Sequence, residues 1–533
     1  MELHKLIRYT FLACSIGALA ACDSADSTTA TTTQNPPAIP TAVTISGSVF
    51  ASDVNGATVT AKKVSDGSTV GGPVMSAADG SYSMDILDTD LATDLVIEST
   101  GGIFDDEEGD IGVPAGSLSA YVAGGTLAAG DSVHVTPDST IHSDLITKYN
   151  KKPTEAQTAF FNAFAHNVDT SVDPVDITDP ASFNADDASR HAGWRAAVYS
   201  RLAKTLTLAS FEQFDMFAAI AKDLSHGTMD GLNASGQVLI GTTGINAPVL
   251  ADYITATDSF TTSEAANLKV TYTPPMMNVH GKNQFTLTIE DTSGDAPTPV
   301  TGLTDLQVMP KMYMTDRTHG TPMSDVITES APGVYDVTAY YLMPSRKMDG
   351  TTQGTWDLTV TASNKTVHFY PNIKMAMMDN TVKTAPLYGV DDIVIDMNGL
   401  PTERPYNLFR DGDPVLQGAG PNYDFDIFIA AMENMMSFPP LVVDETLESG
   451  MGGTSLLVDT VDIEIKVNDA VDWDTTSAQP SGNNDGKWTL NTLQLNTDPD
   501  VSTINTIKVR LIVNGEVKTT TGFSLVDPNA PPD

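Results

Sequence analysis

Cysteine is almost missing from this chain. Its 533 residues include two, Cys14 and Cys22, and both lie near the start. If residues 1–21 are removed as a signal peptide, one thiol remains and no internal disulfide can form. The stability of the folded protein must therefore come from hydrophobic cores.

Basic residues are also scarce. Lys and Arg number 28 against 68 Asp and Glu, which gives a formal net charge of −40. A surface of this charge repels nucleic acid and anionic lipid, so we expect no nucleic-acid partner. It favours cations and basic proteins as partners. The alternative is that the acidity only keeps an envelope protein soluble.

The common motifs of catalysis are absent as well. The sequence has no nucleophile elbow, P-loop, dinucleotide fingerprint, HExxH or CxxC. It also lacks CxxCH, the haem attachment motif of c-type cytochromes. We therefore expect a protein that is not an enzyme.

The chain begins with features of an exported protein. An apolar run from Tyr9 to Ala21 is shorter than the about 20 residues that span a bilayer, which indicates a signal peptide over residues 1–21. The run ends in LAAC, which resembles the bacterial lipobox and implies a lipid on Cys22. The alternative is plain secretory cleavage that leaves Cys22 as a free thiol.

A lipid on Cys22 would attach the protein to a membrane of the bacterial cell envelope. The leaflet stays open between the outer membrane and the periplasmic face of the inner membrane. Residues 22–42 are mostly small, polar or proline, which predicts a flexible tether. The rest of the chain is long enough for about three or four domains.

Hydrophobic periodicity predicts a multidomain, mainly β protein. Residues 43–135 alternate apolar and polar positions, as in GSYSMDI, which is typical of an antiparallel β-sandwich. Residues 136–250 change to helical spacing, as in SFEQFDMFAAIAKDL, which predicts a small helical bundle inserted before the next β module. Strand patterns return over 268–370 and 385–533. A weak echo of Met-x-x-Met followed by Gly-x-Trp-x-Leu indicates that these are two related Ig-like β-sandwiches.

The helical segment carries three histidines, His166, His191 and His226. They fall on different expected helices or at helix ends, so a shared site is one interpretation. Separate surface or core positions are the other.

Residues 43–135 also resemble a known module. The order Gly-Ser-Val, Gly-Ala-Thr-Val and Ala-Asp-Gly-Ser-Tyr is similar to that of the carboxypeptidase regulatory-like domain. That resemblance implies an Ig-like scaffold without catalytic residues.

Methionine is abundant where the strand patterns return. Eleven methionines lie between Met276 and Met378, together with three histidines. Thioether sulfur suits Cu(I), and imidazole suits either oxidation state of copper. In a strand MPKMYM, Met312 and Met314 would share one face, with a loop following that contains HGTPM. The alternative is that the methionines fill a core, which their flexibility allows.

Residues 268–370 resemble the YtkA-like domain, which is related to the FixH family. The similarity rests on the ordered segments DLQVMPKMYM, HGTPM, PGVYDVTAYYLM and GTWDLTV. It implies an Ig-like extracytoplasmic domain associated with copper handling or respiratory oxidase assembly. The candidate metal ligands that it implies are Met312, Met314, His319, Met323 and Met343.

Two functions are therefore open. In the first, a lipid-anchored envelope protein binds copper or another soft metal for storage, delivery or sensing. In the second, it is a surface scaffold or adhesion protein whose Ig-like modules contact a protein partner. Replacing His319 and Met312 would abolish metal binding in the first case and change stability or nothing in the second.

Overall fold

The computed structural model describes residues 40–375, except 180, 181 and 183, and most of residues 385–525. In the second range it leaves out residues 397–398, 413, 418–421, 450–452, 469, 471, 475–478, 481–484, 496–504 and 519–520. The expected signal peptide, Cys22 and most of the expected tether lie outside the described residues. The chain divides into two units after Pro40, and the helices and strands of the described residues all belong to the second unit, Thr41–Asp533.

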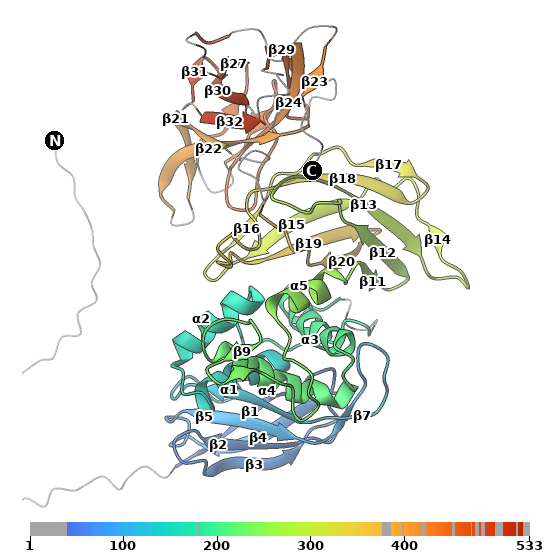
Figure 1. The fold of residues 1–533 in the computed structure, drawn as a ribbon, viewed down its shortest axis with the longest axis vertical. Helices are drawn as coiled ribbons and strands as arrows, with labels where there is room; N and C mark the ends of the chain where they lie inside the picture. Colours follow the sequence, from blue (N-terminus) through green and yellow to red (C-terminus); the bar gives the residue numbers. More distant parts are fainter. Residues whose placement is uncertain are drawn as a thin grey trace, which may run out of the picture. The chain divides into compact units, whose positions relative to one another are not determined.

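The architecture within that unit is mainly β, with helices between β modules, which confirms the predicted fold class (Figure 1). Among the described residues, the strands pair in antiparallel fashion, apart from isolated bridges. None of the helices in this part of the chain is long and apolar enough to span a membrane.

The first sheet has six strands. They are β1 (Ala42–Ser48), β4 (Ser81–Leu87), β3 (Thr69–Met75), β2 (Thr58–Lys63), β5 (Leu95–Thr100) and β8 (Ser117–Val122), in this spatial order. The short strands β6 (Ile103–Phe104) and β7 (Val113–Pro114) lie between β5 and β8 in the sequence and pair with each other. Along β4, buried Tyr82, Met84 and Ile86 alternate with exposed residues, because successive side chains of a strand face opposite sides of the sheet.

Five α-helices follow in the described residues. They are α1 (Pro137–Thr147), α2 (Pro153–Phe164), α3 (Asp187–Thr205), α4 (Gln213–Leu224) and α5 (Leu250–Asp258), with a small hairpin of β9 (Leu232–Asn233) and β10 (Gly236–Gln237) before α5. The start of α1 is fixed by Thr136, whose side chain accepts a hydrogen bond from the Ser139 N–H, and by a proline at the first helical position.

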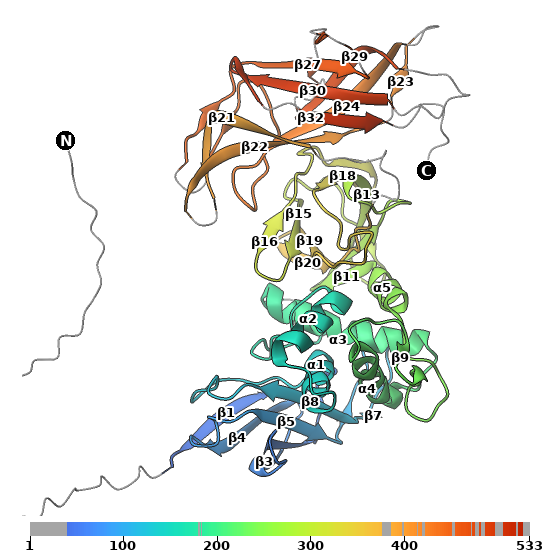
Figure 2. The ribbon, with the colours of Figure 1, turned by 60° about the vertical axis from the view of Figure 1, so that its left-hand side comes forward.

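Sheet and helices share one hydrophobic core. Helix α1 packs on β8 and on α4 (Figure 2). The same cluster of buried side chains includes Ile97 and Leu118 from the sheet and Ile141 and Phe217 from the helices. The expected boundary at residue 135 therefore separates two kinds of secondary structure but not two cores.

The next module is a β-sandwich with its own core. One sheet has the order β11 (Thr262–Ala265), β12 (Leu268–Thr273), β13 (Gly281–Asp291), β18 (Val334–Tyr341) and β17 (Thr328–Ala331), with β14 (Thr298–Pro299) paired to β13. The other has the order β16 (Thr318–Gly320), β15 (Gln307–Tyr313), β19 (Thr355–Ala362) and β20 (Lys365–Phe369). Leu287 and Val337 from the first sheet pack with Trp356 from the second.

The last module also contains two main sheets. The larger has the order β21 (Ala385–Ile395), β22 (Pro401–Arg410), β24 (Asn422–Ala431), β29 (Lys487–Gln494) and β28 (Gln479–Pro480), with β23 (Val415–Leu416) paired to β24. The smaller joins β27 (Val461–Val467), β30 (Asn505–Val513), β31 (Glu516–Val517) and β32 (Thr521–Leu525). A short pair, β25 (Thr446–Leu447) with β26 (Leu456–Leu457), completes it. Tyr406, Ile427 and Leu511 are among its buried core residues.

A buried carboxylate holds the helices together. Asp138, in the first turn of α1, accepts hydrogen bonds from Tyr199 Oη at 2.9 Å and from Arg195 Nε at 2.6 Å. His166 Nε2 lies 3.1 Å from the same carboxylate. Burial alone would raise the pKa of Asp138, but the charges of His166 and Arg195 lower it below its usual range.

We expect Asp138→Asn to lower the free energy of unfolding by about 3–5 kcal/mol, because it leaves the Arg195 cation buried without a counter-charge. Urea denaturation followed by far-UV circular dichroism measures this loss. Asp66→Asn is the control, since Asp66 is an exposed turn residue that accepts from Ser68 N–H, and it should change stability by less than about 0.5 kcal/mol. Equal effects of the two changes would contradict the prediction.

Candidate functional site

The methionine- and histidine-rich stretch forms the hairpin of β15 and β16. The sequence predicts a loop at His319, but residues 318–320 pair with β15 as a short strand. The turn at residues 314–317, closed by a hydrogen bond from Met314 N–H to Arg317 O, reverses the chain and makes this pairing possible.

The hairpin sets three side chains on one face. Met312 is directly opposite His319 of β16 and, on its other side, directly opposite Trp356 of β19. Directly opposed residues of neighbouring antiparallel strands project from the same face of a sheet. This face is the core face, because Met312 and Trp356 are both 0% exposed.

His319 is buried, and both of its ring nitrogens have neighbours. Nδ1 lies 2.7 Å from the carbonyl oxygen of Gly320, and Nε2 lies 3.1 Å from Met343 Sδ. Burial lowers the pKa of His319, and the nearby Arg317 charge lowers it further. The imidazole is therefore neutral at pH 7 and carries one proton. Because a carbonyl oxygen can only accept, that proton is on Nδ1.

The lone pair of His319 Nε2 consequently faces the sulfur of Met343. An unprotonated imidazole nitrogen and a thioether are both donors that suit Cu(I). Trp356 holds this pair in place. Its Nε1 donates to Met343 O at 3.2 Å, and its ring stands edge-on to the His319 ring with centroids 5.3 Å apart. The donor set therefore fits a soft metal ion.

Of the five expected ligands, His319 and Met343 are in direct contact. Among the described residues, Met343 is the methionine whose sulfur lies within hydrogen-bonding range of His319. Met312 adjoins His319 through strand pairing and belongs to the buried core. Met314 and Met323 are half-buried and pack against the same core, and Met323 forms an isolated bridge with Ala339 of β18.

Two of the three helical histidines do come together. The rings of His166 and His191 have centroids 5.8 Å apart, whereas His226 lies beyond the end of α4 near Asp223 and Asp230. His191 accepts from Arg195 and stacks on aromatic rings, and burial lowers its pKa well below the usual range. This pair belongs to the buried network of Asp138, which no sequence motif could reveal.

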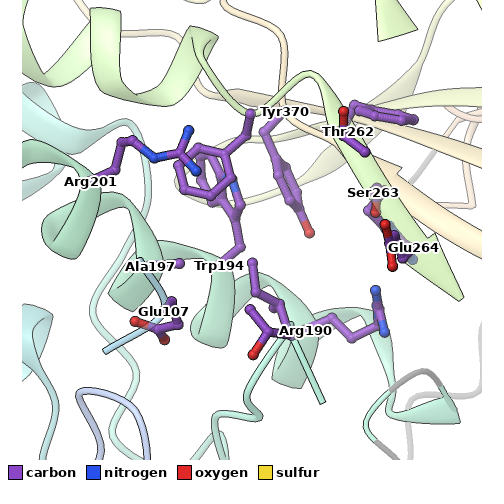
Figure 3. A pocket seen from close by; sticks show the side chains of 14 residues that line it. Glu107, Arg190, Trp194, Ala197, Arg201, Thr262, Ser263, Glu264 and Tyr370 are labelled. Carbon is purple, nitrogen blue, oxygen red and sulfur yellow. The ribbon is translucent and has the colours of Figure 1, made fainter. Parts of the chain in front are cut away.

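A cavity of about 310 Å³ lies between α3 and the edge strands of the sandwich (Figure 3). Its lining mixes the charged Glu107, Arg190 and Arg201 with the aromatic Trp194 and Tyr370. Burial raises the pKa of Glu107 well above its usual range, and Ser200 donates to it at 3.1 Å. Arg201 pairs with Glu108 and lies 4.2 Å from the ring centroid of Phe260. Arg201 and one carboxyl oxygen of Glu107 thus already have partners within the chain.

Comparison with known proteins finds only weak similarity to solved structures. No protein-family model and no curated protein matches this chain. The adhesin InvE of Yersinia pseudotuberculosis shares 15% identity over 49% of this chain and 60% of its own, with a TM-score of 0.16. Domains 5–6 of the S-layer protein SbsC share 13% identity over 48% of this chain and 99% of their own, with a TM-score of 0.14. Similarity at this level leaves function to be argued from the residues themselves.

Two methionines of the same strand should respond differently to truncation. Met312→Ala should lower the free energy of unfolding by about 2–5 kcal/mol, because it opens a cavity in the sandwich core. Met309→Ala should change it by less than about 0.5 kcal/mol, because Met309 is 53% exposed. Thermal and urea unfolding without added metal measure both values. Similar losses for the two variants would mean that Met312 has no special place in the core.

Proposed function

We propose that this chain is a non-catalytic cell-envelope protein in which firmly joined β modules form a scaffold for contacts with a protein partner. The observation that supports this proposal is the buried contact at each junction between successive modules. Domains that meet through small polar surfaces usually move relative to one another. Junctions that bury charged and aromatic groups resist such motion.

At the junction between the helices and the sandwich, side chains of the sandwich donate hydrogen bonds to the last carbonyl groups of α2. The last carbonyl groups of an α-helix have no partner within the helix. Arg346 of the sandwich donates to Asn162 O and Ala163 O, each at 2.6 Å. Thr355 donates to Ala165 O at 2.9 Å. Burial lowers the pKa of Arg346 to about 10, and its cation at a helix C-terminus is favoured by the helix dipole.

The junction between the sandwich and the last module is aromatic. The rings of Tyr340 on β18 and Phe428 on β24 stack with centroids 4.0 Å apart. Tyr340 Oη donates to Asp411 at 2.5 Å, and Lys282 pairs with the same carboxylate. Tyr340 belongs to a small hydrophobic cluster whose other fully buried members, including Phe409, come from the last module. The two modules are therefore connected by a buried core of their own.

A protein of this kind holds the surfaces of its modules at fixed distances from one another. The proposal includes a lipid on Cys22, the tether of residues 22–42 and an envelope location. It also includes the carboxypeptidase regulatory-like and YtkA-like resemblances, both of which imply Ig-like modules. The net charge of −40 favours a basic protein as the partner and disfavours nucleic acid.

Spin labels test whether the modules are firmly joined. With Cys14→Ser and Cys22→Ser as background, labels on Ser68→Cys and Asp295→Cys would report the distance between the first sheet and the sandwich, since both positions are exposed. We expect one narrow distance distribution. Arg346→Ala should broaden it and lower the free energy of unfolding by about 1–3 kcal/mol, because Ala163 O loses its donor and Asn162 O keeps only the hydrogen bond from Thr352.

Lys347→Ala is the matched control for Arg346→Ala. Lys347 is the next residue and is exposed, so its replacement should leave the distance distribution narrow. A broad distribution in the unmodified chain would contradict the scaffold proposal.

Soft-metal binding is a second candidate function, favoured by the contact of His319 Nε2 with Met343 Sδ at 3.1 Å. Copper bound here would be held by these two atoms, with Met312 beside them and Met314 and Met323 at the same core. Bound copper would supply the chemistry of storage, delivery or sensing. The chain's part is to keep the imidazole neutral and the sulfur in position.

Cu(I) competition titration on the full chain tests this candidate. We expect one-to-one binding that His319→Ala and Met343→Leu each weaken at least about tenfold, since each removes one donor. Met309→Leu is the control, because it changes an exposed methionine of the same strand as Met312. Binding that none of the three changes affects would make the His319 and Met343 contact a feature of packing alone.

A further inference from the structure

The turn after α4 brings three chemically reactive side chains together. Helix α4 ends at Leu224, and the sequence continues as SHGTMD to Asp230. Gly227 has a φ of +109°, a conformation open to glycine because it has no Cβ. The chain therefore turns back here, and His226 and Asp230 come to lie beside Asp223 from the last turn of the helix.

Asp223 has one carboxylate oxygen without a partner. Its side chain is 0% exposed, and Oδ2 accepts from Gly231 N–H at 2.8 Å. Oδ1 is buried and has no hydrogen-bond partner among the described residues, and it lies 4.0 Å from His226 Nδ1. A buried polar atom that is left unsatisfied costs about 1–3 kcal/mol, so a missing partner at this oxygen calls for an explanation.

The His226 ring has Nδ1 near Asp223 and Nε2 near Asp230. Nδ1 lies 2.5 Å from the carbonyl oxygen of Asp223, so this nitrogen carries the proton and donates. Nε2 lies 3.5 Å from Asp230 Oδ1 and 2.9 Å from the hydroxyl of Thr228, which can donate to it. Histidines that bind metals usually donate their other ring N–H to a carbonyl or a carboxylate in this way.

We propose that Asp223, His226 and Asp230 bind one divalent transition-metal ion of the Zn²⁺ type. One ligand atom from each residue lies within 4.8 Å of the others, close enough to converge on one ion with small adjustments. Two carboxylates match the charge of a dication, and the ion would supply the partner that Asp223 Oδ1 lacks. Water would complete the coordination, because His226 and Asp230 are on the exposed side.

The donor set favours Zn²⁺ over Ca²⁺. Zinc is bound by imidazole and carboxylate at a coordination number of about four. Calcium takes about six to eight oxygen ligands, which this turn does not gather among its described residues. The bound ion would connect the end of α4 to the residues that lead into the β9 and β10 hairpin.

Zn²⁺ titration of the full chain against a competing chelator tests the site. We expect one-to-one binding that His226→Gln and Asp230→Asn each weaken at least about tenfold, because each removes one ligand. Both positions are exposed, so the variants should melt like the unmodified chain without zinc. Zinc should raise the melting temperature of the unmodified chain and not that of the variants.

Asp169→Asn is the matched control. Asp169 and Asp230 both accept a hydrogen bond from the backbone N–H two residues later, at 2.9 Å and 3.0 Å. Both changes remove one charge from an acidic turn and keep the geometry of that turn, but only Asp230→Asn removes a metal ligand. Absence of zinc binding, equal binding by all three variants, or tighter binding of Ca²⁺ than of Zn²⁺ would each overturn the proposal.

Discussion

The buried carboxylate of Asp138 is the interaction on which the helical part of the molecule depends. An isolated anion is unstable in an apolar interior, so groups from the rest of the helical layer must converge on it. Tyr199 and Arg195 reach it from α3, and His166 reaches it from the segment after α2. Arg195 also donates to His191, whose ring stacks on Tyr313 and Tyr370 of the sandwich. One charge thereby fixes the helices and the aromatic surface that meets the next module.

Basic residues in this chain are few, and several stabilise contacts between segments that are far apart in sequence. Arg346 satisfies the carbonyls of α2, and Lys282 pairs with Asp411 of the last module. Lys311 pairs with Asp187 at the start of α3. Because the rest of the surface is acidic, a cation placed between two modules finds a carboxylate or a carbonyl on either side. A small number of basic residues is therefore enough to stabilise the contacts between modules.

Sequence patterns predicted the elements whose burial is periodic. The alternation of β4 and the stripe of Phe214, Phe217 and Leu224 on α4 both reflect burial of one face. His319 in a strand was missed, because three residues form β16 only through pairing with β15. Its approach to Met343, and the meeting of Asp223 with His226, depend on where the chain turns in three dimensions. Contacts of this kind leave no periodic signal, so the fold was more predictable than the sites.

The core that runs from the first sheet into the helices limits how this protein can be divided. The face of the sheet that contributes Ile97 and Leu118 shares its core with the helices, and α1 packs on β8. A gene fragment ending near residue 135 would encode a sheet with that face bare, and the product would aggregate. The two later β modules each have a core of their own, and the cluster of Tyr340, Phe409 and Phe428 joins them. The first sheet and the helices would have to be inherited together, as one evolutionary unit.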